Sequence, residues 1–424
     1  MKSRPLIVSL VFTALIILGL FILKRQTSKV TKVPAPAETI SPPVVPIKHP
    51  PRDFIPEWSA LDAYQNTITA TRFQEMIETV YTVGDTWKEV IAISTEEATI
   101  QTEDGDFILK FLPEGAEPPA SVERYWGEGP LAGLHIAIDP GHIGGKFAEV
   151  EERQFGFPED KPVREGEMTL QTAKRLKPLL EEMGAKVSLV RSKNAPVTKL
   201  RTKDFLQMYR EANPGVPDGL LMPWATRRFY RRAEIVERAR IVNEELKPDL
   251  VLCLHYNASS DSGAWADPAK PILVDENHYH MLMNGAYTSG EVLDEGDRFQ
   301  MVERILQRIH EREAALAKVV ASVFVEHTGL PPYMYDPNSS RAKNVDGDPY
   351  LWARNLLANR SYTCPVLYFE PWVMNNKEVY ARIQAGDYDG VKEVAGKERP
   401  SIMQEYATAV AAGIEKFYSS VEAE

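Results

Sequence analysis

Cysteine is scarce in this sequence, because only Cys253 and Cys364 occur among its 424 residues. Two cysteines form at most one disulfide bond, which excludes a small fold held together by several bridges. Both lie in strongly apolar stretches, and we expect them to be buried free thiols. They therefore leave the redox state of the protein's compartment open.

Positive charge is also in short supply. The 49 basic side chains are outnumbered by 60 acidic ones, for a formal net charge of −11. Residues 1–55 hold eight basic and two acidic side chains, so the rest of the chain carries −11 − 6 = −17. No stripe of lysine or arginine runs through this remainder, which disfavours a nucleic-acid partner. With 44% hydrophobic residues, the chain can bury a core in about two or three domains.

One uncharged apolar run, at residues 6–23, is long enough to span a bilayer, and basic residues flank both of its ends. A cleaved signal peptide normally has a shorter apolar region, followed closely by a small-x-small site. The nearest such triplet, at 35–37, is distant and contains proline. We therefore predict an uncleaved signal anchor, a transmembrane helix at residues 1–26, with secretion after cleavage as the alternative.

Two segments separate this anchor from the main body. Prolines recur from 34 to 56 without helical or strand periodicity, so residues 27–57 are predicted to be an extended linker. Residues 58–125 form a small α+β module of unknown role. Thr71 and Gln74 fit a capping box at the start of a short helix, and Asp104-Gly105 fits a hairpin turn between two of three predicted strands. The expected role of the module is packing onto the following domain.

From residue 134 onwards, apolar strands alternate with amphipathic helices. Strands are predicted at 134–139, 186–191, 249–255 and 365–370, and helices at 167–183, 234–245 and 298–327. This order predicts an α/β fold, a three-layer sandwich whose open, mostly parallel sheet is covered by helices on both faces.

Three of these strands end in a residue that could bind a metal or transfer a proton: His142, His255 and Glu370. Ligands of open α/β sheets gather at the carboxyl ends of the strands, so we expect these side chains to converge. Two imidazoles and one carboxylate leave the fourth position of tetrahedral zinc open for water, as in hydrolytic zinc sites. Zinc lowers the pKa of that water toward about 7, and a nearby carboxylate can then accept its proton.

Six ordered blocks of sequence resemble zinc-dependent N-acetylmuramoyl-L-alanine amidases, the type 3 family of cell-wall hydrolases. The resemblance covers about residues 132–418, and we assign the catalytic domain to 132–420. The blocks are IAIDPGH (136–142), EGEMTL (165–170), VSLVR (187–191), RARIVN (238–243), LHYNA (254–258) and VLYFE (366–370).

The resemblance implies that one Zn²⁺ is bound by His142, Glu165 and His255, and that Glu370 is the general base. The implied reaction is hydrolysis of the amide between N-acetylmuramic acid and the L-alanine of the stem peptide. The implied partners are peptidoglycan, the membrane and a protein activator. The catalytic domain would lie in the cell envelope, on the outer side of the cytoplasmic membrane.

Two asparagines are candidate substrate contacts. Asn257 lies in the fifth block, and Asn376 follows Glu370 by six residues, where the family usually has an asparagine. Capping of the local turn is an equally weighted role for Asn376.

The sequence does not decide which carboxylate is the second metal ligand. His142 and Glu165 are 165 − 142 = 23 positions apart, and an insertion at 143–164 separates them. The alternatives to Glu165 are four other carboxylates: Glu149, Glu151, Glu152 and Glu167.

Two more insertions, at 192–230 and 259–297, depart from the family pattern. The latter follows His255 and could form a lid over the metal; it contains His278 and His280, which would face the same side of an extended strand. We expect these two histidines to lie at the surface or around the ligands rather than to bind the metal. For the helical region 298–327 we expect core packing rather than autoinhibition.

Two other functions remain in competition. A catalytically silent wall-binding or regulatory homologue would be expected to lack Glu370 or a ligand, and this sequence keeps all four residues. A zinc hydrolase acting on another cell-envelope amide or peptide is compatible with the sequence, since the insertions could reshape the binding groove.

Overall fold

The computed structural model describes residues 46–50, 54–116, 129–259, 271–336 and 339–421. The chain divides into two compact units, Met1–Ile47 and Lys48–Glu424. The predicted anchor at 1–26 and most of the predicted linker lie outside the described residues. Within the described residues, no helix is both long and apolar enough to cross a membrane.

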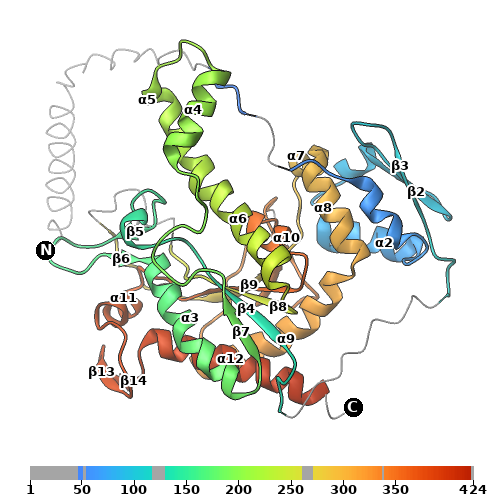
Figure 1. The fold of residues 1–424 in the computed structure, drawn as a ribbon. Coiled ribbons are helices and arrows are strands. Elements are labelled where there is room, and N and C mark those ends of the chain that lie inside the picture. The colour runs from blue at the N-terminus through green and yellow to red at the C-terminus, as the bar shows by residue number, and fades with distance from the viewer. Residues whose placement is uncertain (1–45, 51–53, 117–128, 260–270, 337–338, 422–424) are drawn as a thin grey trace, which may run out of the picture. The chain divides into compact units, whose positions relative to one another are not determined.

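The second unit is built on a seven-stranded sheet with the order β10-β11-β9-β12-β8-β4-β7 (Figure 1). Strands β7, β4, β8 and β12 run parallel to one another, whereas β9 is antiparallel to β12. The predicted open, mostly parallel sheet is thus confirmed. The strands are β4 (His135–Pro140), β7 (Lys186–Leu189), β8 (Leu250–Leu254), β9 (Tyr279–Met283), β10 (Lys343–Asn344), β11 (Leu351–Ala353) and β12 (Val366–Pro371).

Side chains alternate between the two faces of the sheet, and both faces are buried. In β8, Leu250, Leu252 and Leu254 belong to one hydrophobic cluster, and Val251 and Cys253 belong to another. Central parallel strands covered by helices on both faces read as continuous apolar runs for this reason. Cys253 is a buried free thiol, as expected, and the other cysteine is free and half-buried.

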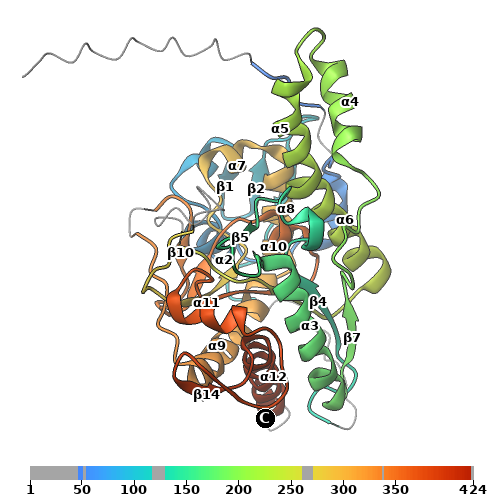
Figure 2. The same ribbon diagram turned by 90° about the vertical axis from the view of Figure 1, so that its left-hand side faces the viewer.

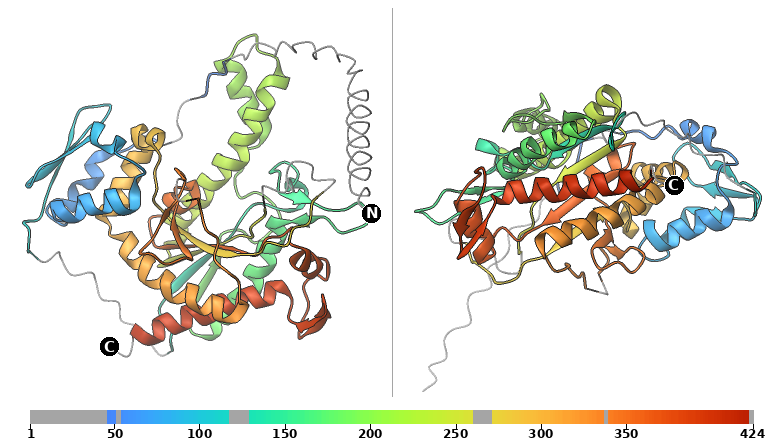
Figure 3. Two further views of the ribbon diagram at one scale, coloured as in Figure 1. Left: turned by 180° about the vertical axis from the view of Figure 1, so that it is seen from behind. Right: turned by 90° about the horizontal axis from the view of Figure 1, so that it is seen from below.

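Helices cover both faces. Helices α3 (Glu165–Glu182), α12 (Ile402–Val421) and α9 (Ile309–Thr328) lie side by side on one face, as the view from below shows (Figure 3). On the other face, Ala239 of α6 (Glu234–Arg240) and Val242 of η6 (Ile241–Leu246) pack against the second hydrophobic cluster, next to α10 (Leu357–Ser361). The predicted three-layer arrangement is therefore confirmed.

The predicted helical region 298–327 consists of two helices. The region forms α8 (Glu295–Leu306) and α9, and the break lies at Arg308, whose φ of 53° is left-handed. The break lets Arg304 of α8 and Glu313 of α9 form a buried ion pair, with 2.5 Å between Nη2 and Oε1. Helix α9 packs against β9, β11 and β12, so it contributes to the core.

The N-terminal module has a short helix, α2 (Ala70–Met76), and an antiparallel sheet of β1 (Ile91–Ile93), β2 (Glu97–Ile100) and β3 (Phe107–Lys110). The capping residue of α2 is Thr69 rather than the expected Thr71, because its hydroxyl accepts a hydrogen bond from the backbone N–H of Arg72. The module packs onto α8, because the indole N–H of Trp58 donates to Glu295, at 2.9 Å.

The insertion at 192–230 forms a helical hairpin of α4 (Thr202–Ala212) and α5 (Asp218–Arg228), which projects beyond the sheet (Figure 2). The chain before the module contacts this hairpin. The backbone N–H of Lys48 donates to the side chain of Asn213, whose amide donates back to the Lys48 carbonyl.

Candidate metal centre

The first candidate ligand, His142, lies in the turn that follows β4. Gly141 donates its backbone N–H to the carbonyl of Leu254 on β8, at 2.9 Å, and His142 adopts a left-handed φ of 57°. A methyl group on Gly141 would come within 3.0 Å of three ring atoms of His255. The glycine therefore lets the imidazole at the end of β8 lie directly against the turn that carries His142.

His142, Glu165 and His255 form a compact cluster whose potential ligand atoms lie within 4.8 Å of one another. His142 Nε2 is 3.1 Å from one Glu165 oxygen, and His255 Nδ1 is 3.2 Å from the other. The two imidazole rings are nearly perpendicular, with centroids 5.0 Å apart. One carboxylate thus bridges two imidazoles that come from neighbouring strands.

Glu165 reaches the histidines from the first residue of α3. Its Oε1 also accepts the backbone N–H of Tyr256, at 3.1 Å, and the side chain is 3% exposed. The helix start is held against the loop after His142, because a methyl group on Gly166 would lie within 3.0 Å of the backbone of Ile143 and Gly144. This close approach brings together residues that are 23 positions apart.

None of the four alternative carboxylates contacts both His142 and His255. Glu149 is exposed, Glu152 is exposed and lies 3.7 Å from Arg231, and Glu167 pairs with Arg164 at 3.0 Å. Of the five carboxylates considered, Glu165 is the one that contacts both histidines.

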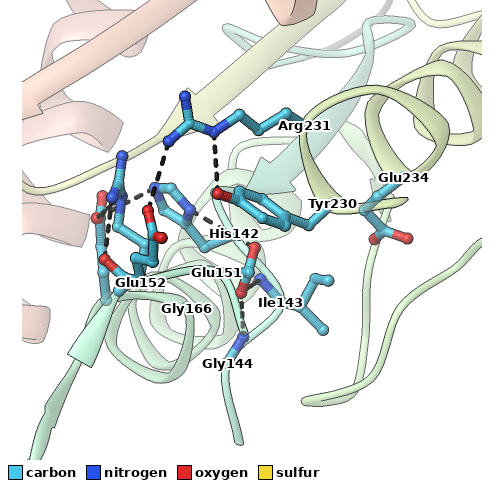
Figure 4. Close-up of polar contacts among 12 residues, drawn as sticks. His142, Ile143, Gly144, Glu151, Glu152, Gly166, Tyr230, Arg231 and Glu234 are labelled. Atoms are coloured by element: carbon cyan, nitrogen blue, oxygen red, sulfur yellow. Dashed lines mark hydrogen bonds and ion pairs between the residues drawn. The ribbon is translucent and has the colours of Figure 1, made fainter. Parts of the chain in front are cut away.

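Glu151, the fourth alternative, contacts the His142 ring at Nδ1 (Figure 4). Its Oε1 is 3.6 Å from His142 Nδ1, the nitrogen that faces away from Glu165. Its Oε2 accepts the backbone N–H groups of Ile143, at 2.8 Å, and Gly144, at 3.3 Å. Carboxylates in this place orient a metal-binding histidine and set its tautomer.

Two buried arginines hold the loop that carries His142. Arg238 donates to the His142 carbonyl, at 2.6 Å, and to the carboxylate of Asp139, at 2.8 Å. Arg191 donates to the carbonyls of Gly166, at 2.8 Å, and Gly141, at 3.3 Å. Both guanidinium groups are therefore engaged in maintaining the backbone of the site.

Burial and charge set the protonation of the cluster. Burial alone would lower the pKa of His142, but the charge of Glu165 and hydrogen bonds to Glu151 and Glu165 raise it to about 9. Burial lowers the pKa of His255. Burial would raise the pKa of Glu165, but His142 and His255 hold it well below its usual range. A positive His142, a neutral His255 and an ionised Glu165 therefore coexist at neutral pH.

The donor set fits a divalent metal ion. Two imidazole nitrogens and one carboxylate oxygen are typical ligands of zinc, and three protein ligands leave a position for water or substrate. Glu165 faces both rings, so His142 Nε2 and His255 Nδ1 are the nitrogens placed for coordination.

Glu370 lies near the end of β12, two residues after Tyr368, so both side chains project from the same face of the sheet. The Tyr368 ring stacks on the ring of His255, with centroids 4.4 Å apart and planes 11° apart. Burial and the charge of Glu165 raise the pKa of Glu370 to about 8, although Arg354 and His142 oppose the shift.

The two candidate asparagines differ in the number of hydrogen bonds that their side chains make. The Asn376 oxygen caps α11 (Lys377–Gln384), where it accepts two backbone N–H groups, and its amide donates to the carbonyls of Asp275 and Glu276. Asn257 is half-buried, and its oxygen accepts the next backbone N–H. The structure thus places Asn376 in a capping role.

Sequence reasoning missed a contact between the insertion at 143–164 and the turn before α6. Arg231 donates to the Tyr230 hydroxyl, at 3.0 Å, and its other end faces Glu152 (Figure 4). Both residues belong to a π-helical turn, η5 (Phe229–Ala233), directly before α6. The sequence does not predict where Tyr230 and Arg231 lie. They follow the insertion at 192–230, and its course through the structure depends on contacts with distant segments.

Metal binding should release about one proton between pH 7 and 9, because His142 is protonated below its pKa of about 9 and must become neutral to coordinate. Since the proton competes with the metal, affinity should fall by up to ~10-fold for each pH unit below 9. Calorimetric titration of the metal-free protein in buffers of different ionisation enthalpy measures the number of protons released. Affinity independent of pH across this range would contradict the assigned charge of His142.

Comparison with known proteins agrees with this geometry. A family model described as N-acetylmuramoyl-L-alanine amidase matches residues 136–396, which is more than half of the chain. The comparison with curated proteins gives no match at the threshold applied.

Several solved amidase structures are similar to this chain. Ami1 from Mycobacterium smegmatis is 16% identical with a TM-score of 0.40, over 68% of this chain and 99% of that one. The CwlD amidase from Clostridioides difficile, solved in complex with the GerS lipoprotein, is 14% identical with a TM-score of 0.38, over 68% and 99%. AmiC2 of Nostoc punctiforme is 17% identical with a TM-score of 0.35, over 69% and 99%.

Proposed function

This chain belongs to the N-acetylmuramoyl-L-alanine amidase family, whose members hydrolyse amide bonds in peptidoglycan, and we propose that it does so with zinc. The proposed bond is the amide between N-acetylmuramic acid and the L-alanine of the stem peptide. The observation that carries the proposal is the cluster of His142, Glu165 and His255 within 4.8 Å, with Glu370 on an adjacent strand.

Each residue has a defined task. His142 Nε2, His255 Nδ1 and a Glu165 oxygen would hold the ion, which, when bound, lowers the pKa of a water molecule toward about 7 and polarises a carbonyl. Glu370 would accept the proton of the attacking water and return it to the nitrogen of the leaving amine. A carboxylate whose pKa is raised toward neutrality suits both steps, and that of Glu370 is about 8 without metal.

We also propose where the reaction takes place. Residues 1–26 would anchor the protein in the cytoplasmic membrane, with the catalytic domain on the outer side, where peptidoglycan lies; secretion after cleavage is the alternative. Support for the anchor is the uncharged apolar run at 6–23, which is long enough to span a bilayer. A protein activator is a further proposed partner.

The test is a product analysis. The full chain, purified in detergent, should release intact stem peptides with a free L-alanine amine from purified peptidoglycan. A chelator should stop the release and added zinc should restore it; mass spectrometry identifies the products. Cleavage within the peptide would support the rival hydrolase, and unchanged peptidoglycan would overturn the proposal.

A further inference from the structure

Strand β9 places a histidine opposite Glu370. The strand pairs antiparallel with β12, and in this register His280 is the direct partner of Glu370. Facing residues of an antiparallel pair project from the same face, with Cβ atoms roughly 4.5–5.5 Å apart. His280 is 3% exposed and belongs to the 259–297 insertion. The insertion thus contributes a buried imidazole next to the proposed base.

A chain of hydrogen bonds connects Arg354 to this imidazole through Tyr335. Arg354 Nη1 lies 3.4 Å from the Tyr335 hydroxyl, which lies 3.3 Å from His280 Nε2. A guanidinium only donates, so the Tyr335 oxygen accepts from Arg354 and its hydrogen is free to bond His280 Nε2. A neutral imidazole has one donor and one acceptor nitrogen, and in the tautomer that accepts the Tyr335 hydrogen at Nε2 the donor is Nδ1.

His280 is held in the neutral form. Burial lowers its pKa well below the usual range, and the nearby His278 and Arg354 act in the same direction. A neutral histidine with Nε2 occupied as an acceptor presents a fixed N–H on its other side. In the tautomer that accepts from Tyr335, the relay from Arg354 therefore ends in a single hydrogen-bond donor at His280 Nδ1.

That donor has no acceptor. Within the described residues, His280 Nδ1 is buried without a hydrogen-bond partner. A buried N–H without a partner is costly, which favours an arrangement that satisfies it. Donor and acceptor face each other in register, and hydrogen bonds of active sites often tighten only when substrate is bound.

His278 provides a comparison within the same segment. It is also buried, and its ring packs on Tyr333 at 4.6 Å, as the ring of His280 does at 5.0 Å. It precedes β9 and has no ladder partner on β12. Within the described part of the chain, the two histidines belong to no group of three metal-binding side chains, so a second metal site is not favoured.

We propose that His280 is a positioning residue for Glu370, donating its Nδ1–H to the carboxylate in the substrate complex while Arg354 and Tyr335 fix the tautomer. This inference rests on the proposed function, since it takes Glu370 as the base. The hydrogen bond would orient the carboxylate toward the attacking water and stabilise its ionised form. The charged and titratable groups around Glu370 are Glu165 of α3, His142 and Arg153 of the adjoining loops, Arg354 after β11, Tyr335, Tyr368 of β12 and Tyr406 of α12.

The test compares four variants of the full chain. His280→Phe keeps a ring but removes the donor, and His280→Asn keeps an N–H near the Nδ1 position. Tyr335→Phe leaves the histidine in place but breaks the relay. His278→Phe is the matched control, because it removes a buried histidine that packs on the same tyrosine.

For His280→Phe, we expect kcat to fall roughly 10- to 100-fold, the scale of a hydrogen bond to a charged group. The acid limb of its kcat profile, which reports the substrate complex, should move up by about one pH unit, because the ionised base is less stabilised there. His280→Asn should restore most of the wild-type kcat and most of the wild-type pH profile. Tyr335→Phe should show a smaller fall in kcat and a smaller shift of the acid limb than His280→Phe. His278→Phe should retain the wild-type profile, and KM and metal affinity, measured by chelator competition, should not change in any variant.

Other results would overturn the inference. Equal losses in His280→Phe and His278→Phe would indicate packing alone, and a change confined to KM would indicate a substrate contact. A fall in metal affinity would place the effect at the ligands. If wild-type protein cleaves no peptidoglycan, the proposed function has failed. Titration of Glu370 by ¹³C-carboxyl NMR in metal-free protein saturated with a muramyl peptide, assigned with Glu370→Gln, then tests whether His280→Phe raises its pKa, and an unchanged pKa would refute the contact.

Discussion

Replacing Glu370 with glutamine should lower the rate of amide hydrolysis by about 10²- to 10⁴-fold, the usual contribution of general acid–base catalysis. Glutamine keeps the shape of the side chain but can neither accept the proton of the attacking water nor return it to the leaving amine. Among the hydrogen bonds and ion pairs of the described residues, none joins Glu370 to the three proposed ligands, so the metal should stay bound. Quantifying released stem peptide by mass spectrometry, beside the metal content of the same sample, measures both outcomes.

A matched control is Glu378→Gln on α11, where the carboxylate pairs with Arg399 and Lys397 away from the cluster. It should retain wild-type activity. If Glu370→Gln hydrolyses peptidoglycan at the wild-type rate, another group is the base. If it loses the metal, Glu370 is needed for the ligand cluster and its catalytic role is undetermined by this variant.

Replacing Glu165 with alanine should abolish stoichiometric metal binding and, with it, activity. Glu165 faces both imidazoles and balances the positive charge of His142. Loss of a residue that only supports a ligand costs about 10- to 100-fold in metal affinity, and loss of a ligand should exceed this. Competition with a chromogenic chelator measures the affinity.

The neighbouring carboxylates provide graded controls for this experiment. Glu167→Ala, two residues further along α3, should bind metal as the wild type does, because its carboxylate pairs with Arg164 instead. The metal affinity of Glu151→Gln should lie between those of Glu165→Ala and Glu167→Ala. We expect it to fall about 10- to 100-fold, because Glu151 contacts only the Nδ1 side of the His142 ring. Equal affinities for Glu165→Ala and Glu167→Ala variants would exclude Glu165 as a ligand.

Much of this architecture could be predicted because it depends on local patterns. The apolar strands are buried on both faces, and the carboxyl ends of parallel strands meet at one edge of the sheet. These two regularities were enough to group His142, His255 and Glu370 before their positions were known. The side chains of Cys253 and Leu254 lie in different hydrophobic clusters, because successive residues of a strand point to opposite faces of the sheet.

What could not be predicted depends on contacts between distant segments. Glu165 could not be separated from its neighbours, because the packing of Gly144 on Gly166 that brings it to His142 has no signature in the spacing. The break at Arg308 interrupts an apolar pattern that continues on both sides, and it is stabilised by the buried pair of Arg304 and Glu313. The significance of His280 depended on which strand β9 would pair with, which the sequence does not encode locally.

The absence of a side chain at Gly141 has an evolutionary consequence. Because a methyl group there would overlap the His255 ring, positions 141 and 255 are coupled, and the effect of a change at one depends on the residue at the other. A mutational path that begins at Gly141 passes through a sterically blocked intermediate. A path that begins at His255 relieves the overlap but removes a proposed ligand first. The pair is therefore difficult to exchange by single substitutions, and a homologue with a larger residue at the glycine position should also differ at the histidine.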